Sequence, residues 1–227
     1  MKTIKASDLN CKKYTALLYG APGMGKTTAL GELPGKTLII DIDRGTDVLA
    51  GKKNIEIVRL SPDLKDLTPT IEELEKKCDY DNVCIDTLSE LERGMLGILG
   101  RLGRNGGAPE LAHYNQVQYR IIDIVRRLRL ISANIVLTAW EEYKDVVSLD
   151  GTKFSQTRPM MSGKTAENIC GLCNLVGELI ISPKDGARYV RLQASPTLVA
   201  KDLIFKREFC TPDHLLIAEE KETKANA

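Results

Sequence analysis

The chain has 227 residues, of which 43% are hydrophobic, 28% charged and 5% aromatic, as in an ordinary globular domain with a substantial core. Its 32 Lys and Arg against 31 Asp and Glu give a net charge of +1, which excludes a uniformly basic nucleic-acid-binding protein. No apolar run is long enough to span a membrane and none follows the start. We therefore expect a protein of the reducing cytoplasm that is neither secreted nor membrane-embedded.

The hydrophobic pattern alternates between buried strands and helices along the chain. In chain order, the predicted strands are residues 14–20, 36–43, 54–60, 82–87, 134–140, 176–182 and 188–193. The predicted helices are residues 26–33, 70–78, 89–103, 111–132 and 165–175. Strands that are apolar on both faces and alternate with helices predict an α/β domain. We expect a mostly parallel central sheet with helices on both faces and closing strands on the C-terminal side.

Two parts of this pattern are irregular. Glycines recur within the predicted helix 89–103, and each costs about 1 kcal/mol relative to alanine, so we expect this helix to be weak or broken. Residues 104–109 and 144–164 are rich in polar residues and predict loops. The expected organisation is an N-terminal arm, one domain, and a C-terminal helix or tail that is partly disordered, at residues 1–13, 14–212 and 213–227.

A glycine-rich stretch carries the clearest functional signal. Residues 20–27, GAPGMGKT, satisfy the pattern G-x-x-x-x-G-K-[ST] between a predicted strand and a predicted helix. In such a loop, backbone N–H groups face the β- and γ-phosphates of ATP, the lysine adds positive charge and the hydroxyl binds Mg²⁺. The expected cofactors are therefore ATP and Mg²⁺. The candidate nucleotide-binding residues are Gly20, Ala21, Pro22, Gly23, Met24, Gly25, Lys26, Thr27 and Thr28.

Carboxylates follow two of the predicted strands. Asp86 ends the strand 82–87, where an acid beside the phosphate loop would hold Mg²⁺ together with Thr27. The alternative is that Asp86 only caps the following helix. Asp41 and Asp43 end another strand and are candidates for orienting the attacking water. Strand alternation places both on one face, so spacing does not choose between them.

These residues resemble the RecA-type recombinase ATPase core and, more closely, the phage P-loop proteins that include single-strand-annealing ATPases of the Sak type. The resemblance covers about residues 14–205, and the phosphate loop is its specific motif. It implies a RecA-like P-loop fold in which Asp43 stands where the family has a glutamate that activates water. It also implies that Thr138 matches a strand-end residue near the γ-phosphate, whereas Ala139 and Trp140 replace the family's amide residues.

The resemblance also implies partners. Single-stranded DNA is the expected one, together with further copies of the chain in a ring or filament and a single-strand-binding protein. Arg191 and Lys201 would then reach the nucleotide of the neighbouring subunit. If the protein is phage-encoded, the expected compartment is the host cytoplasm.

Positive charge gathers in one part of the sequence. Residues 93–129 contain seven arginines and only two acids, a local net charge of +5 that leaves −4 for the remainder. Arg101 and Arg104 flank another glycine-rich segment, the predicted loop at residues 104–109. Lys153 and Arg158 lie in the predicted loop at residues 144–164, so these four are the candidate DNA contacts. The alternative for the arginines of the long predicted helix is a solvated face or salt bridges.

Two cysteines form a C-x-x-C motif at Cys170 and Cys173. The sequence has no second cysteine pair or nearby histidine that would complete four zinc ligands. We therefore interpret both as packing residues on a helix face.

The residues together predict a Mg²⁺-dependent ATPase that acts with single-stranded DNA in recombination, annealing or replication. Lys26, Asp43, Asp86 and Thr138 are the candidate catalytic residues. A nucleotide-gated DNA-binding or scaffold module with little hydrolysis is the main alternative, followed by a helicase loader or a small-molecule kinase. A kinase is disfavoured because a predicted strand and helix, residues 54–78, separate the phosphate-loop unit from the Asp86 strand.

Overall fold

The computed structural model describes residues 3, 5, 13–148 and 150–217. Its strands are β1 Thr15–Gly20, β2 Thr37–Asp41, β3 Ile55–Arg59, β4 Asn82–Asp86, β5 Asn134–Val147, β6 Lys153–Pro159, β7 Leu175–Ile181, β8 Arg188–Arg191, β9 Lys201–Asp202 and β10 Phe209–Cys210. They form one sheet in the order β10-β8-β7-β1-β5-β4-β2-β3, to which β6 and β9 attach through β5 and β7. The strands β1 to β5 and β7 pair in parallel, which confirms the predicted mostly parallel sheet.

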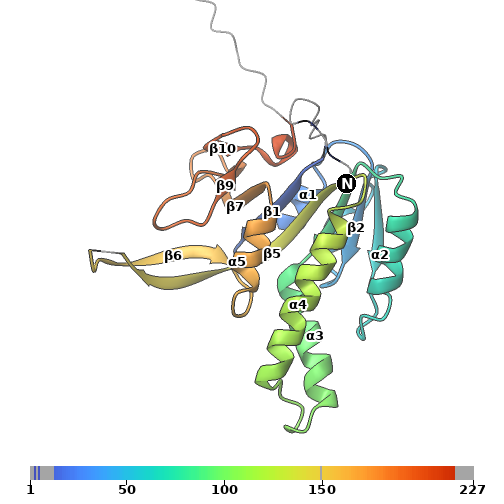
Figure 1. Ribbon diagram of the computed structural model, residues 1–227. Coiled ribbons are helices and arrows are strands. Elements are labelled where there is room, and N and C mark those ends of the chain that lie inside the picture. Colours follow the sequence, from blue (N-terminus) through green and yellow to red (C-terminus); the bar gives the residue numbers. More distant parts are fainter. Residues whose placement is uncertain (1–2, 4, 6–12, 149, 218–227) are drawn as a thin grey trace, which may run out of the picture.

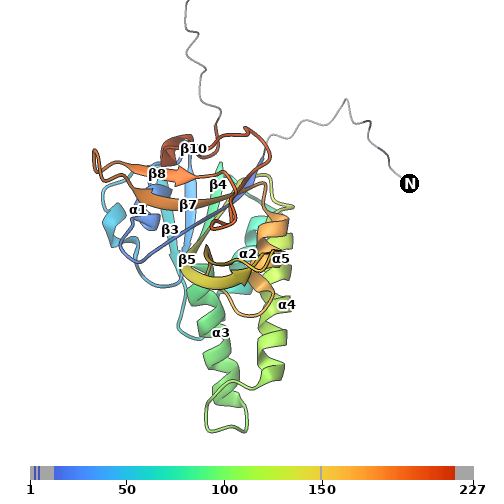
Figure 2. The same ribbon diagram turned by 90° about the vertical axis from the view of Figure 1, so that its left-hand side faces the viewer.

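Helices cover both faces of this sheet (Figures 1 and 2). They are α1 Lys26–Leu30, α2 Leu67–Lys76, α3 Leu88–Leu102, α4 Leu111–Leu128 and α5 Thr165–Leu172, with short 3-10 turns η2 Thr46–Leu49 and η3 Pro212–His214. On one face, α2 to α5 pack into a large apolar core. On the other face, α1, η2 and the chain after η3 form a smaller core. The sheet is therefore buried from both sides, as its apolar strands require.

The parallel strands bring their carboxyl ends to one edge of the sheet. Strands β1, β2 and β4 are buried along their whole length, and β2 and β4 each end in an aspartate. In register, Asp41 of β2 lies beside Asp86 of β4, and Gly20 of β1 lies beside Trp140 of β5. This is the edge at which open α/β sheets bind ligands.

The structure corrects the expectation of a broken helix after β4. Helix α3 runs without interruption from Leu88 to Leu102, and the hydroxyl of Thr87 accepts a hydrogen bond from the backbone N–H of Glu90 at its start. Burial of one apolar face against the sheet and α4 outweighs the cost of the glycines. Gly100 is used for close approach, because a Cβ there would lie 2.5 Å from the carbonyl oxygen of Gly107.

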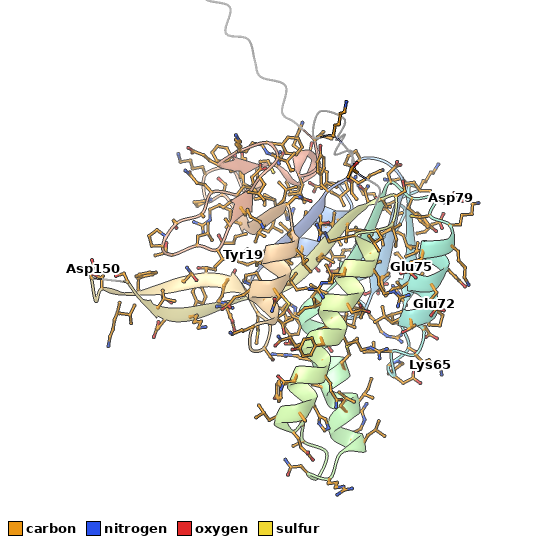
Figure 3. The ribbon with its side chains drawn as sticks, viewed as in Figure 1. Tyr19, Lys65, Glu72, Glu75, Asp79 and Asp150 are labelled. Atoms are coloured by element: carbon orange, nitrogen blue, oxygen red, sulfur yellow. The ribbon has the colours of Figure 1, made fainter. Side chains whose placement is uncertain are left out.

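The expectation of a loop at residues 144–164 is also wrong. Strand β5 continues to Val147 and pairs with antiparallel β6, forming a hairpin that projects from the body of the protein (Figure 1). Val146 lies opposite Phe154 in this pairing, a cross-strand apolar pair that stabilises a hairpin. Asp150 lies at its far end (Figure 3), next to Gly151, whose φ of +85° suits a tight turn. The prediction failed because the segment is mostly polar and its few apolar residues do not form a strand-like run.

The packed part of the chain continues past residue 212. Leu215 and Leu216 are buried in the smaller core beside α1, whereas the remainder of the expected tail, residues 218–227, lies outside the described residues, as does most of the expected arm, residues 1–13. Within the part of the chain that the structure describes, no helix has the length and hydrophobicity needed to cross a membrane.

Candidate nucleotide-binding site

The glycine-rich loop lies between β1 and α1, as its pattern predicts. Gly23 and Gly25 have φ values of +84° and +88°, a left-handed conformation that side chains other than glycine rarely adopt. The loop therefore needs glycine at both positions to turn from strand to helix. The structure brings the remaining nucleotide-binding candidates together in this loop and in the first turn of α1, namely Gly20, Ala21, Pro22, Met24, Lys26, Thr27 and Thr28.

Lys26 folds back over this loop. Its Nζ donates hydrogen bonds to the carbonyl oxygens of Gly20 at 2.8 Å and Ala21 at 3.0 Å, and the residue is only 8% exposed. Burial lowers the pKa of Lys26, and the nearby carboxylates of Asp86, Glu141 and Asp43 oppose that change. The amine is thus held at the loop, where a phosphate is its natural counter-ion.

A chain of hydroxyl and carboxylate groups links the loop to the centre of the sheet. Thr27 Oγ1 donates to Asp86 Oδ2 at 2.6 Å, and Thr138 Oγ1 donates to Asp86 Oδ1. Because β5 lies between β1 and β4, Thr138 reaches Asp86 from the intervening strand. The three predicted residues therefore form one cluster.

Asp86 is buried at the end of β4. Burial raises the pKa of Asp86, and the hydrogen bonds from Thr138 and Thr27 oppose the rise. A carboxylate next to a threonine hydroxyl supplies the hard oxygen ligands that Mg²⁺ prefers. The donor chemistry of Thr27 and Asp86 thus fits Mg²⁺, which would neutralise charge on the phosphates when bound. The capping role considered for Asp86 belongs instead to Thr87.

The structure distinguishes the roles of Asp41 and Asp43, between which sequence spacing does not choose. Asp41 is buried, accepts a hydrogen bond from Thr46 Oγ1 at 2.5 Å and lies 3.4 Å from Arg59 Nε. Asp43 lies beyond the end of β2 on the solvent side, where its Oδ1 accepts the backbone N–H of Gly45 at 3.1 Å. Asp41 therefore has a local structural role, which leaves Asp43 as the better candidate to orient water.

Asp43 also lies on the side of the site that carries Thr27. A Cβ built on Gly45 would lie 3.0 Å from Asp43 Oδ1 and 3.6 Å from Thr27 Oγ1. Partial burial raises the pKa of Asp43, and the negative charge of Asp86 adds to the rise. A carboxylate whose pKa is raised is a stronger base for a water molecule than a fully solvated one.

Two residues that sequence reasoning underrated tie the neighbouring elements together. The hydroxyl of Ser89 donates to the carbonyl oxygen of Met160 at 2.9 Å and accepts the N–H of Trp140 at 2.9 Å. Glu92 of α3 is buried and accepts the N–H of Ser162 at 2.8 Å. Their partners lie before and after the hairpin in sequence, so sequence spacing did not reveal these contacts.

Arg188 of β8 also contacts the phosphate loop, although no sequence motif predicts this. Its Nε donates to the carbonyl oxygen of Met24 in the loop at 3.1 Å. The two residues are far apart in sequence, so only the closing strands of the sheet bring them together.

The candidate DNA residues do not share one surface. Arg101 and Arg104 are exposed at the end of α3 and in the turn before α4, and Lys153 is exposed on β6. These helices and the hairpin project in different directions (Figure 1). The expected exposure of Arg158 needs correction, because this residue is 6% exposed and lies 3.3 Å from Glu142 and 3.7 Å from Glu167.

On α4, Arg127 is bound to Glu75 of α2 at 2.8 and 2.7 Å, where Figure 3 shows Glu75 facing α4. This is the salt bridge that the alternative interpretation of the helix arginines considered. The positive charge of the sequence segment is therefore partly neutralised along α4, while Arg101 and Arg104 make no ion pair within the described residues.

The two residues expected to act on a neighbouring subunit make contacts within their own chain. Arg191 of β8 forms an ion pair with Glu178, its cross-strand partner on β7. Lys201 Nζ donates to the carbonyl oxygen of Cys170 at 2.6 Å, near the C-terminal end of α5.

The C-x-x-C cysteines lie around the end of α5. Burial raises the pKa of Cys170 to about 11 and raises that of Cys173 further, so neither thiol is a ready thiolate at neutral pH. Among the residues that the structure describes, no group of three or more His, Cys, Asp or Glu is arranged to hold a metal ion.

Comparison with known proteins agrees with this geometry. A model of the AAA domain family matches residues 12–203, a range that includes the phosphate loop, Asp43, Asp86 and Thr138. A search of curated proteins finds no match. The matched range covers most of the chain, and the chain belongs to the AAA domain family, whose members are P-loop nucleotide-binding ATPases.

Proposed function

We propose that this protein binds and hydrolyses Mg·ATP and couples that cycle to single-stranded DNA, as in the annealing or recombination ATPases that its sequence resembles. One observation supports this coupling most directly. Both projecting elements begin at residues of the nucleotide site: α3 follows Asp86 directly, and β5 carries Thr138 in the sheet and then enters the hairpin.

Within the site, each candidate has a defined task. Lys26 and the loop N–H groups bind the phosphates, Thr27 and Asp86 hold Mg²⁺, and Asp43 orients the attacking water. Thr138 connects Asp86 to β5, so a change at Asp86 on hydrolysis is transmitted to that strand.

At the other ends of these elements lie the proposed DNA contacts. Arg101 and Arg104 present cations in the turn between α3 and α4, and Lys153 presents one on the hairpin. Cations on glycine-rich and hairpin segments can follow a phosphate backbone without reading its sequence. Further copies of the chain in a ring or filament, and a single-strand-binding protein, complete the proposed assembly.

A second candidate is a nucleotide-gated DNA-binding module with little hydrolysis. It is favoured by Asp43, whose side chain is one methylene shorter than the glutamate of the resembling family, and by Ala139 and Trp140, which lack amide groups. Both candidates use the same nucleotide site and differ in turnover.

The test is ATP turnover measured with and without single-stranded DNA, with Lys26→Ala as the control for the phosphate site. We expect turnover that DNA stimulates and that Lys26→Ala abolishes. Nucleotide binding without turnover would favour the second candidate, the DNA-binding module. If the protein turns over ATP but neither binds single-stranded DNA nor is stimulated by it, the DNA assignment fails.

A further inference from the structure

Arg188 lies directly on the phosphate loop. It is the first residue of β8 and pairs with Ile181 of β7. From this position its side chain reaches Met24 in the loop. Besides the hydrogen bond from Nε to the carbonyl oxygen of Met24, the guanidinium covers Gly25. A Cβ built on Gly25 would lie 2.4 Å from Arg188 Nε and 2.9 Å from Cζ, so this close contact requires glycine at that position.

Arg188 differs from the other arginines nearby in having no acidic partner. Arg191 on the same strand pairs with Glu178, and Arg207 pairs with Asp202 at 2.9 Å. Within the described residues, Arg188 forms no ion pair, although the residue is half-buried. A partly desolvated guanidinium without a counter-ion is unfavourable, and a ligand anion would remove that cost.

Its free hydrogen-bonding groups suit such an anion. A guanidinium has five N–H donors, and Met24 takes the one on Nε, so the terminal nitrogens keep their donors for oxygen atoms of a phosphate. The half-buried position of Arg188 beside Met24 and Gly25 keeps these donors next to the loop.

Lys26 and Arg188 together hold three carbonyl oxygens of the loop, those of Gly20, Ala21 and Met24. These oxygens carry partial negative charge and would repel a phosphate group that came near them. The two cations thus offset the unfavourable part of the loop's own field.

We propose that Arg188 is a second cation of the phosphate site, which binds the phosphate chain of the nucleotide from within the same chain. This rests on the proposed nucleotide binding and assigns a further binding residue to it. Because the contact is made in cis, it needs no neighbouring subunit, unlike the roles expected for Arg191 and Lys201.

The test is the affinity for Mg·ADP measured by titration calorimetry on the full chain. Arg188→Ala weakens binding by roughly 10- to 100-fold, the scale for loss of a charge-assisted hydrogen bond. Lys184→Ala, which removes one exposed positive charge from the same β7–β8 hairpin, changes the affinity by less than about twofold.

Salt separates phosphate binding from a merely structural effect on the loop. If Arg188 contacts phosphate, the difference in affinity between the unmodified protein and Arg188→Ala shrinks as salt rises, because screening weakens only the charged contact. A difference that does not change with salt would overturn the proposal. Thermal unfolding without nucleotide checks that the variant folds.

The remaining outcomes distinguish this proposal from the function on which it rests. If the unmodified protein binds Mg·ADP, Lys26→Ala does not, and Arg188→Ala binds normally, Arg188 has no role and the nucleotide site stands. If the unmodified protein fails to bind Mg·ADP, the proposed function fails, and the role of Arg188 fails with it.

Discussion

The edge of the sheet around Asp86 differs from the two projecting elements, α3 and the β5–β6 hairpin, in the burial and bonding of its polar groups. At the edge, Lys26, Asp86 and Thr138 are buried, and each bonds to another group of the same site. On the projecting elements, Arg101, Arg104 and Lys153 are exposed and make no ion pair within the described residues.

The difference has a physical consequence. Buried groups that are bonded to one another hold a fixed geometry, which phosphoryl transfer needs. Exposed charges on flexible side chains adapt to an irregular polyanion and contribute mainly through salt-dependent attraction. Substitutions at the edge should therefore affect chemistry, and substitutions on the projections should affect association.

The largest expected effect is at Asp86. Asp86→Asn keeps the shape of the side chain but removes the charge that is proposed to hold Mg²⁺, so we expect ATP turnover to fall on the order of 10³-fold. Steady-state turnover across a Mg²⁺ titration measures this. Asp79→Asn, an exposed aspartate near the opposite end of β4 (Figure 3), makes the same chemical change and should leave turnover unchanged. Equal turnover in both variants would contradict the metal role.

The next largest effect is expected at Asp43, and the same experiment distinguishes the role of Asp43 from that of Asp41. Asp43→Asn should lower turnover about 10²-fold, the usual scale for a lost general base, with nucleotide affinity retained. Asp43→Glu should keep turnover or raise it. Asp41→Asn instead should lower the midpoint of thermal unfolding, because Asp41 bonds to Thr46 and Arg59 inside the fold. A larger loss of turnover in Asp41→Asn than in Asp43→Asn would reverse the assignment.

Charge reversal on the projecting helices tests the other side of the comparison. The double variant Arg101→Glu, Arg104→Glu should weaken binding to single-stranded DNA by about tenfold or more near 0.1 M salt and reduce the salt dependence, while ATP binding is unchanged. Fluorescence anisotropy with a labelled oligonucleotide measures this. The matched control is Lys76→Glu, Lys77→Glu at the C-terminal end of α2. Similar losses in both variants would indicate only a long-range effect of net charge.

The smallest expected effect is on stability. Burial raises the pKa of Asp86 above its usual value of 3.8, so in the nucleotide-free protein the folded state binds a proton that the unfolded state has released. The free energy of unfolding should therefore fall as pH rises from about 3.8 through the raised pKa. Asp86→Asn should remove this contribution. Denaturant unfolding of both proteins across that interval measures the difference, and parallel curves would show that Asp86 carries no such penalty.

Much of the fold and the core of the site followed from local sequence. The apolar runs predicted the parallel strands because both faces of these strands are buried. The glycine spacing predicted a turn between β1 and α1, and the structure has Lys26 and Thr27 at the start of α1 directly after it. Asp86 was predicted because it ends a buried strand at the sheet edge, whereas Thr138 was named only through the family resemblance.

The remainder depended on contacts between distant segments. The part of β5 beyond Trp140 and the strand β6 were missed because these two segments stabilise each other across a turn, and neither is apolar enough to be recognised alone. Glu92, Ser89 and Arg188 have roles only once that hairpin and the closing strands are in place. A choice between Asp41 and Asp43 required knowing that β2 ends at Asp41.

The contacts of Ser89 and Glu92 give the two projections a common base. Both residues belong to the first two turns of α3, yet they hold the chain on either side of the hairpin, at Trp140, Met160 and Ser162. A rotation of α3 would therefore carry the hairpin with it. These contacts lie within the first turns after Asp86 along the chain, so a change of geometry at Asp86 would reach both projections through the same base.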